Sequence, residues 1–355
     1  MTIKNKIKIP KLSLSDKIKG IKGAYKRLKN NGLTNKDSYT TLKEGIERQV
    51  CCTTCTDGYS CPYCGCVIKA KKLLSTENCP DLEKYPHLRK FPPKNYWSVT
   101  KEKTSVIIPA RNEKYLNKTI ENLLETATGE IEILVGMDGW DFDYEVIKDD
   151  RVRVFKEKEH IGRRSIHNKL AKEAIGKYLL KIDAHVIFDL GWDTKLKCVC
   201  EENTIVGPSV GIIDEDKWEP KEGRWAGFDM DENLKGTWRT ESIEKKIEEV
   251  MACPGTGWMI QKDTFWKFGG NNLSLSKWSD EEAEWACNIW LTGGKVLIRT
   301  DVVCAHLFRD KFPYKIENDS DRTLKILRQL WWFKTRKNQT MTIKELVKKF
   351  SDRIS

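Results

Sequence analysis

Short apolar runs alternate with amphipathic segments from residue 105 onward. Four short, mostly apolar runs predict strands, at residues 105–109, 131–135, 152–155 and 178–182. Between them, the segments 117–126 and 165–174 carry apolar residues at helical spacing and predict helices. This alternation favours an α/β fold, with a doubly wound, mostly parallel sheet and helices on both faces. Ligands of such sheets bind beyond the carboxyl ends of the strands, so the residues that follow each strand are the candidates for chemistry.

The pattern differs on either side of this α/β segment. Before it, short helical stretches rich in lysine are followed by a cluster of cysteines and then by four prolines, which indicate an extended linker. After it, apolar spacing predicts a helix over residues 322–334, and Thr342-Ile-Lys-Glu345 is a capping box for a last helix. These patterns divide the chain into a basic helical extension (1–50), a Cys-rich segment with its linker (51–100), the α/β domain (101–316) and basic C-terminal helices (317–355).

Composition adds the division of charge along the chain. The 355 residues are 39% hydrophobic, which permits a packed core, and no apolar run approaches the length of about 18 residues that a membrane span needs. Residues 1–100 hold 20 basic and 8 acidic residues, residues 101–309 hold 31 and 38, and residues 310–355 hold 12 and 6. Basic extensions of this kind bind nucleic acid, an acidic glycan or an acidic protein, or are exposed to solvent without a partner.

Seven of the twelve cysteines lie between residues 51 and 79. Two Cys-x-x-Cys pairs in this stretch are spaced to present four thiolates to one structural zinc ion. The four predicted ligands are Cys52, Cys55, Cys61 and Cys64, with Cys66 and Cys79 as substitutes. Two alternatives are free thiols and a redox motif at Cys61-Pro-Tyr-Cys64, although that motif needs a preceding strand and a following helix that the pattern does not supply.

Asp183-Ala-His185 follows directly on the last of the four predicted strands. An Asp-x-His spacing on extended backbone places the carboxylate and the imidazole on the same side. These two ligand types suit Mn²⁺, or Mg²⁺, and such an ion can bridge a diphosphate. The triplet alone is weak evidence, and its strength comes from the motifs around it.

Those motifs, taken in order, resemble the polypeptide N-acetylgalactosaminyltransferases (glycosyltransferase family 27) and, more broadly, family 2 enzymes with the GT-A fold. The resemblance covers roughly residues 104–316. Its motifs are Ser105-Val-Ile-Ile-Pro-Ala-Arg-Asn-Glu113, Leu134-Val-Gly-Met-Asp138-Gly, Gly162-Arg-Arg-Ser-Ile-His-Asn168, Asp183-Ala-His185, Gly227-Phe-Asp229, Gly255-Thr-Gly-Trp-Met259, Trp278-Ser-Asp-Glu281-Glu-Ala-Glu284 and Cys304-Ala-His306-Leu-Phe-Arg309. One departure is Met137, which stands where the family has a first Asp before Asp138.

The resemblance implies a transferase that uses a nucleotide-diphosphate sugar as donor, most simply a UDP-sugar, with a divalent metal at the diphosphate. It implies Asp183, His185 and His306 as the metal ligands, and Asp183, Glu281 and Glu282 as the catalytic residues. The residues it assigns to the nucleotide sugar are Pro109, Ala110, Arg111, Asn112, Glu113, Asp138, Gly139, Gly162, Arg164, Asn168, Ala184, Gly257, Trp258 and Arg309.

The stereochemical course depends on the residue after Glu281. The polypeptide transferases retain the anomeric configuration and have Asn at that place, whereas inverting family 2 enzymes have a second acid that serves as general base. Here the residue is Glu282. The Asp-x-His and His-x-Phe-Arg motifs favour retention, and an inverting enzyme that builds a glycan with Glu282 as base is the alternative.

The sequence leaves the acceptor open. A protein Ser/Thr hydroxyl follows from the resemblance, and a hydroxymethylated DNA base follows from the basic N-terminal segment, which would contact phosphates. A glycan or lipid-linked sugar is a third candidate, and a non-catalytic zinc-dependent binding protein is the rival class. The family's membrane anchor and C-terminal lectin domain find no counterpart in the 355 residues, so we expect no membrane partner. We also expect a microbial or viral relative that works in the cytoplasm, of the host if viral.

Overall fold

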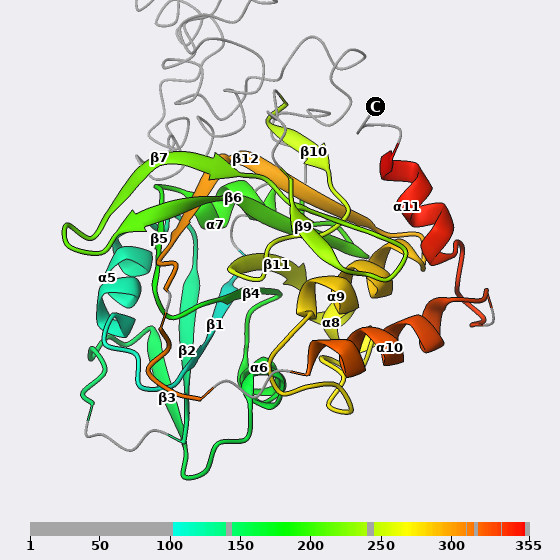
Figure 1. Cartoon of the computed structure of the whole chain (residues 1–355). Helices are drawn as coiled ribbons and strands as arrows, with labels where there is room; N and C mark the ends of the chain where they lie inside the picture. Colours follow the sequence, from blue (N-terminus) through cyan, green and yellow to red (C-terminus); the bar gives the residue numbers. More distant parts are fainter. Residues whose placement is uncertain are drawn as a thin grey trace, which may run out of the picture. The chain divides into compact units, whose positions relative to one another are not determined.

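The computed structural model describes residues 102–139, 144–239, 245–309, 311–315, 319–334 and 336–351 (Figure 1). The cysteine cluster predicted to bind zinc and the basic N-terminal segment lie outside these residues. In chain order the elements are β1 (Thr104–Ala110), α5 (Leu116–Thr126), β2 (Ile131–Asp138), β3 (Val152–Glu157), α6 (Arg163–Glu173), β4 (Tyr178–Ile182), β5 (Val186–Phe188), α7 (Trp192–Lys197), β6 (Thr204–Asp214), β7 (Glu219–Trp225), β8 (Phe228–Met230), β9 (Gly236–Trp238), β10 (Ile247–Glu249), β11 (Gly257–Gln261), α8 (Lys262–Lys267), α9 (Glu281–Trp290), β12 (Lys295–His306), α10 (Ser320–Trp331) and α11 (Ile343–Ser351).

The first half of the sheet is parallel, as the alternation of strands and helices predicts. Four strands lie in the order β3-β2-β1-β4, and all three of these pairings are parallel. Crossover helices α5 and α6 connect them, which places the carboxyl ends of β1, β2 and β4 at one edge. The candidate residues that follow these strands therefore meet at that edge.

Beyond β4 the sheet is mixed rather than parallel. The strand order continues β11-β6-β12-β10, with β11 antiparallel to both β4 and β6 and with β12 parallel to β6. The chain enters this half through a short strand, β5, which pairs antiparallel with the end of β12 and joins His306 to Val186 in register. That pairing carries the end of β12 to the loop that follows β4.

Side chains of the central strands alternate between two hydrophobic layers, as expected of a sheet covered on both faces. On β1, Val106 and Ile108 belong to the layer that includes buried residues of α5 and α7, whereas Ile107 belongs to the other layer. The second layer contains buried residues of α6, α9, α10 and α11. Among the helices in the described residues, none has the length and apolarity that a bilayer crossing requires.

Helix α11 begins with the capping box that the sequence predicts. The hydroxyl of Thr342 accepts from the backbone N–H of Glu345 at 3.3 Å, and the Glu345 carboxylate accepts from the Thr342 N–H at 2.7 Å. We expect Thr342→Ala to lower the free energy of unfolding by about 1 kcal/mol, because it leaves a helix N-terminal donor without its partner. Urea unfolding measures this change. Thr342→Ser keeps the hydroxyl and should stay close to wild type, and equal losses in both variants would contradict the assignment.

Candidate active site

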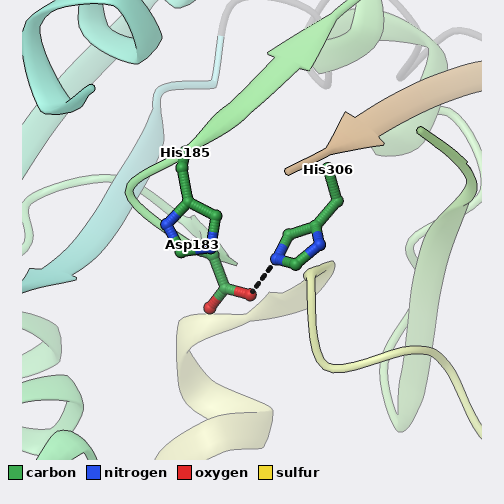
Figure 2. A group of neighbouring side chains, drawn as sticks. All are labelled: Asp183, His185 and His306. Carbon is green, nitrogen blue, oxygen red and sulfur yellow. Dashed lines mark ion pairs between the residues drawn. The ribbon is translucent and has the colours of Figure 1, made fainter. Parts of the chain in front are cut away.

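Three side chains with metal-ligating atoms meet at the carboxyl edge of the sheet (Figure 2). Asp183 and His185 lie in the loop between β4 and β5, and His306 is the last residue of β12. Their ligand atoms all lie within 4.8 Å of one another, and His306 Nε2 is 3.3 Å from Asp183 Oδ2. The backbone fixes the approach, because the Leu307 N–H donates to the His185 carbonyl at 3.1 Å. The metal trio implied by the sequence motifs is therefore brought together.

The protonation states of Asp183 and His306 suit a divalent cation. Burial alone would raise the pKa of Asp183, but the Arg163 guanidinium and His306 outweigh it and hold that pKa well below its usual value. Burial lowers the pKa of His306 despite the neighbouring carboxylate, so its imidazole is neutral at neutral pH. A carboxylate with two imidazoles is a donor set that Mn²⁺ and related ions accept, provided that the imidazoles are unprotonated. The residues present thus fit the ion that the motifs imply.

Glu113, which follows β1, holds two of the site's side chains in place. Its Oε2 atom lies 2.9 Å from His185 Nδ1 and accepts from Arg309 Nη2 at 2.6 Å. Its Oε1 atom accepts from the backbone N–H of Tyr115 at 3.0 Å. Burial alone would raise the pKa of Glu113, but His185 and Arg309 outweigh it and lower that pKa. A carboxylate on Nδ1 orients the ring and leaves Nε2 for a metal ion.

We expect Glu113→Gln to weaken Mn²⁺ binding by about 10- to 100-fold, the usual effect of losing the carboxylate that orients a ligating imidazole. Titration calorimetry with Mn²⁺ measures the change. Glu121→Gln on the exposed face of α5 makes the same chemical change away from the site and should bind Mn²⁺ as wild type does. An unchanged Mn²⁺ affinity in the Glu113 variant would contradict the orienting role.

A pocket of about 310 Å³ opens beside the metal trio. Ten of the residues predicted for donor or metal line it: Pro109, Ala110, Arg111, Glu113, Asp138, Asp183, Ala184, His185, His306 and Arg309. They come from the ends of β1, β2, β4 and β12. Arg111 lies over the ring of Tyr314 at 5.2 Å, and its Nε atom is buried without a hydrogen-bond partner in the described residues. A ligand phosphate is the kind of group that would satisfy such a donor.

Three predicted residues, Asn112, Gly139 and Gly162, shape the backbone around the pocket without lining it. All three have positive φ, and a side chain at Gly139 would meet the backbone N of His160 at 2.7 Å. Asp138 holds the same loop, because its carboxylate accepts from the N–H groups of Ile161 and Gly162 at 2.7 and 3.0 Å. The motifs assign these three residues to the nucleotide sugar, whereas the structure places them in separate turns, after β1, after β2 and before α6.

Arg164 is placed differently from its prediction. Only 1% of it is exposed, and its guanidinium is bound to the Glu284 carboxylate and to the carbonyls of Ser276 and Ser279. The preceding residue, Arg163, lines the pocket and donates to Asp183 Oδ1 at 2.8 Å. Successive side chains on a helix point about 100° apart, so α6 directs one arginine of the pair to the pocket and the other beneath α9.

The other residues predicted to bind the nucleotide sugar lie behind the walls of the pocket. Asn168 exchanges hydrogen bonds with the backbone of Asn271 at 2.8 and 2.9 Å. Gly257 and Trp258 lie in β11, where Trp258 is buried with its ring 5.4 Å from that of Trp285. Trp258 points into the protein because α9, which carries Trp285, covers that face of the sheet. These residues support the pocket and do not line it.

The two predicted catalytic acids at the start of α9 have opposite electrostatic surroundings. Glu281 is buried, 2.9 Å from Lys181 Nζ and 3.7 Å from Arg163 Nε, and these cations overcome burial and lower its pKa. Burial dominates at Glu282 and raises its pKa. Carboxyl groups whose pKa values are pushed apart are typical of acid–base pairs. Neither side chain lines the 310 Å³ pocket in the described residues.

His167 lies against Glu281 and is buried, and burial lowers its pKa to about 3. In the folded protein His167 therefore stays neutral, whereas in the unfolded chain it is protonated below about pH 6.5. The free energy of unfolding keeps its full value above pH 6.5 and decreases as the pH falls from 6.5 toward 3. Between pH 7 and pH 5 we expect about 2 kcal/mol of lost stability from this residue, measured by urea unfolding. His167→Gln should remove that part of the pH dependence, and an identical pH profile in the variant would refute it.

Several pocket residues were not predicted as site residues: His160, Arg163, Lys277, Trp278, Leu307, Phe308, Phe312, Tyr314 and Lys315. Some of them, such as Arg163 and Phe308, belong to the motifs quoted above, and their place in those motifs could have identified them as site residues. His160 Nδ1 lies 2.7 Å from Asp138 Oδ2, a contact between residues 22 positions apart that local sequence spacing does not predict.

Residues 105–269 match the family model described as glycosyl transferase family 2. The crystal structure of GalNAc-T7 with UDP, GalNAc and Mn²⁺ superposes with a TM-score of 0.54 at 19% identity, over 71% of this chain and 54% of that one. The GT-A type of fold expected from the motifs is therefore confirmed for the described residues.

Among curated proteins, polypeptide N-acetylgalactosaminyltransferase 10 of Rattus norvegicus is 24% identical over 262 residues, which cover 64% of this chain and 42% of the relative. The putative polypeptide N-acetylgalactosaminyltransferase 13 of Drosophila melanogaster is 26% identical over 246 residues, or 62% of this chain and 44% of the relative. The chain thus spans less than half the length of these relatives.

Proposed function

We propose that this protein is a metal-dependent glycosyltransferase that moves a sugar from a nucleotide-diphosphate sugar, in the first place a UDP-sugar, to an acceptor hydroxyl. The observation that carries the proposal is the convergence of Asp183, His185 and His306 within 4.8 Å at the edge of a pocket. That pocket follows the carboxyl ends of β1, β2 and β4, where α/β sheets bind nucleotides. The named relatives are N-acetylgalactosaminyltransferases, and the GalNAc-T7 structure contains UDP, GalNAc and Mn²⁺, which agrees with this reaction.

The pocket supplies the charge that a departing diphosphate needs. A divalent ion held by the trio would neutralise the diphosphate as the glycosidic bond breaks. Arg111 and Arg309 line the same pocket and extend the positive charge, while Glu113 keeps Arg309 in position. Arg163 reaches the pocket from the start of α6, although Asp183 and Glu281 already balance much of its charge.

For the acceptor we propose a Ser or Thr hydroxyl of a polypeptide. An aromatic cluster adjoins the metal trio: Phe308, with its ring 4.6 Å from that of His306 and 43% exposed, lies 6.0 Å from both Trp225 and Trp238. Half-buried aromatic faces suit an apolar or cyclic group next to the reacting hydroxyl. The polypeptide relatives favour this acceptor. A hydroxymethylated DNA base is the second candidate, because residues 1–100 carry 20 basic against 8 acidic residues.

For the stereochemical course we propose retention, on the strength of the Asp-x-His and His-x-Phe-Arg motifs. Inversion is the alternative, because the raised pKa of Glu282 beside the ionised Glu281 is what a general base for the acceptor hydroxyl would have. The anomeric configuration of the first product, read by proton NMR before mutarotation, separates the two courses.

The experiment that tests the function incubates the full chain and Mn²⁺ with a panel of nucleotide sugars and two acceptors. One acceptor is a set of Ser/Thr peptides, and the other is duplex DNA with hydroxymethylated bases. Mass spectrometry of intact peptides and of digested nucleosides reads the product. A mass gain of one hexose or N-acetylhexosamine on peptide supports the first acceptor, and the same gain on nucleosides supports the second. No turnover of any donor would refute the catalytic function.

A further inference from the structure

A second and larger pocket, of about 850 Å³, lies away from the metal trio. Residues of α6, α8, α9 and α10 line it, together with the turn after α8 and residues 336–339. None of its lining residues lines the 310 Å³ pocket. Its volume is within the range of small-molecule sites in proteins. The nucleotide-sugar chemistry described above makes no use of it.

The charge of this pocket is strongly one-sided. Its lining contains Lys172, Lys267, Arg336 and Lys337. The one carboxylate in the lining, as far as the described residues go, is Glu284. That carboxylate is already bound by the Arg164 guanidinium and accepts from the Asn272 N–H at 2.7 Å. The pocket therefore offers an excess of positive charge to an anion.

Two buried amide side chains in the lining have unused hydrogen-bonding capacity. Asn288 on α9 is 8% exposed, and its side-chain amide has no hydrogen bond to any part of the chain that the structure describes. Gln339 is 5% exposed; its Nε2 donates to the Trp331 and Met341 carbonyls, but its Oε1 has no partner within the described segments. The buried Gln339 Oε1 without a partner costs free energy, which a ligand hydroxyl would recover, and Asn288 presents a second amide to the same pocket.

Aromatic side chains complete the lining. Trp266 and Phe268 are half-buried at the end of α8, and they stand beside the Gly269-Gly270 turn. Arg336 lies 4.4 Å from the ring centre of Trp331, which fixes one of the cations against the wall. Aromatic faces with neighbouring amides are groups that bind sugar rings, and cations beside them bind phosphate.

We propose that this pocket is a second binding site, separate from the metal centre, for a phosphorylated sugar. The sugar ring would contact Trp266 and Phe268 and bond to Asn288, and the phosphate would meet Lys172, Arg336 and Lys337. A free sugar phosphate and the phosphorylated end of a nucleic acid strand share this chemistry. The proposal does not depend on the proposed transferase function, because none of its residues takes part in that reaction.

The test is titration calorimetry of the full chain with ribose 5-phosphate, in EDTA so that the metal centre does not contribute. We expect saturable binding with a Kd below about 1 mM. Asn288→Leu keeps the volume and removes the amide, and Lys172→Glu with Lys337→Glu reverses charge at two exposed positions. Each variant should weaken binding at least about tenfold. Lys148→Glu, at a lysine whose side chain is 87% exposed in a different region, and His306→Ala should bind as wild type does.

A second arm replaces the probe with a 5′-phosphorylated oligothymidylate. Tighter binding of the oligonucleotide, weakened by the same variants, would assign the ligand to nucleic acid, whereas equal or weaker binding would assign it to a free sugar phosphate. Either result supports the site. Absence of saturable binding by both probes would overturn it, as would binding that His306→Ala removes and Asn288→Leu leaves unchanged. Circular dichroism of each variant separates a lost site from a lost fold.

Discussion

Replacing Asp183 by Asn is expected to lower the Mn²⁺-dependent turnover of nucleotide sugar by at least about 1000-fold. The change keeps the shape of the side chain but removes the one anionic ligand of the trio, 3.3 Å from His306 Nε2. It also leaves Arg163, which donates to Asp183 at 2.8 Å, without that ionic partner. Both effects act at the point where the diphosphate would be neutralised. Steady-state release of the nucleoside diphosphate measures the loss.

Asp189→Asn is the matched control for this variant. Asp189 lies just after β5, and its carboxylate pairs with Lys195 at 3.1 Å instead of pointing to the metal trio. The control should retain turnover within about threefold and should unfold close to wild type. Comparable turnover in the Asp183 and Asp189 variants, with both folded, would remove Asp183 from the mechanism.

Replacing Lys181 by Met is expected to lower the free energy of unfolding by about 3 kcal/mol, as when one partner of a buried ion pair is removed. Lys181 is 1% exposed on β4, and its Nζ lies 2.9 Å from Glu281 Oε2 and donates to the Gly255 carbonyl at 2.6 Å. Without it, the cation that Glu281 keeps among the ion pairs of the described residues is the more distant Arg163, at 3.7 Å, because the neighbouring His167 is neutral. Urea unfolding measures the change.

Two further variants make this prediction specific. Lys177→Met removes a half-exposed lysine whose ion pair with Glu102 is 3.9 Å long, and it should change stability by less than about 0.5 kcal/mol. Combining Lys181→Met with Glu281→Leu removes both buried charges and should recover stability relative to Lys181→Met alone. A single variant as stable as wild type, or a double variant that loses the sum of two large effects, would contradict the buried pair.

The parallel half of the sheet could be predicted because its strands are short, mostly apolar runs. β1 and β4 appear in the sequence within one or two residues of their observed ends. β6, by contrast, contains Gly207, Pro208 and Gly211, and its burial depends on pairing with β12 some 90 residues later. Local pattern carries no information on such a pairing, so the mixed half of the sheet was not foreseen.

The candidate site divides in the same way. Asp183 and His185 follow from the spacing of a strand end, whereas the place of His306 follows from the family motif and the β5–β12 register. Arg163 reaches the pocket and Arg164 does not, because the burial of α6 against the sheet fixes how the helix is rotated about its axis. The sequence alone does not predict this rotation. The pairing of Glu281 with Lys181, 100 residues apart, likewise required the fold.

The most direct test of the central claim is the release of UDP from UDP-sugars by the full chain, measured with Mn²⁺ and again after its removal by EDTA. We expect turnover of at least one UDP-sugar that requires Mn²⁺, returns when Mn²⁺ is restored, and is lost in Asp183→Asn but kept in Asp189→Asn. Turnover that persists in EDTA, or that Asp183→Asn leaves intact, would contradict a metal-dependent transferase centred on Asp183, His185 and His306.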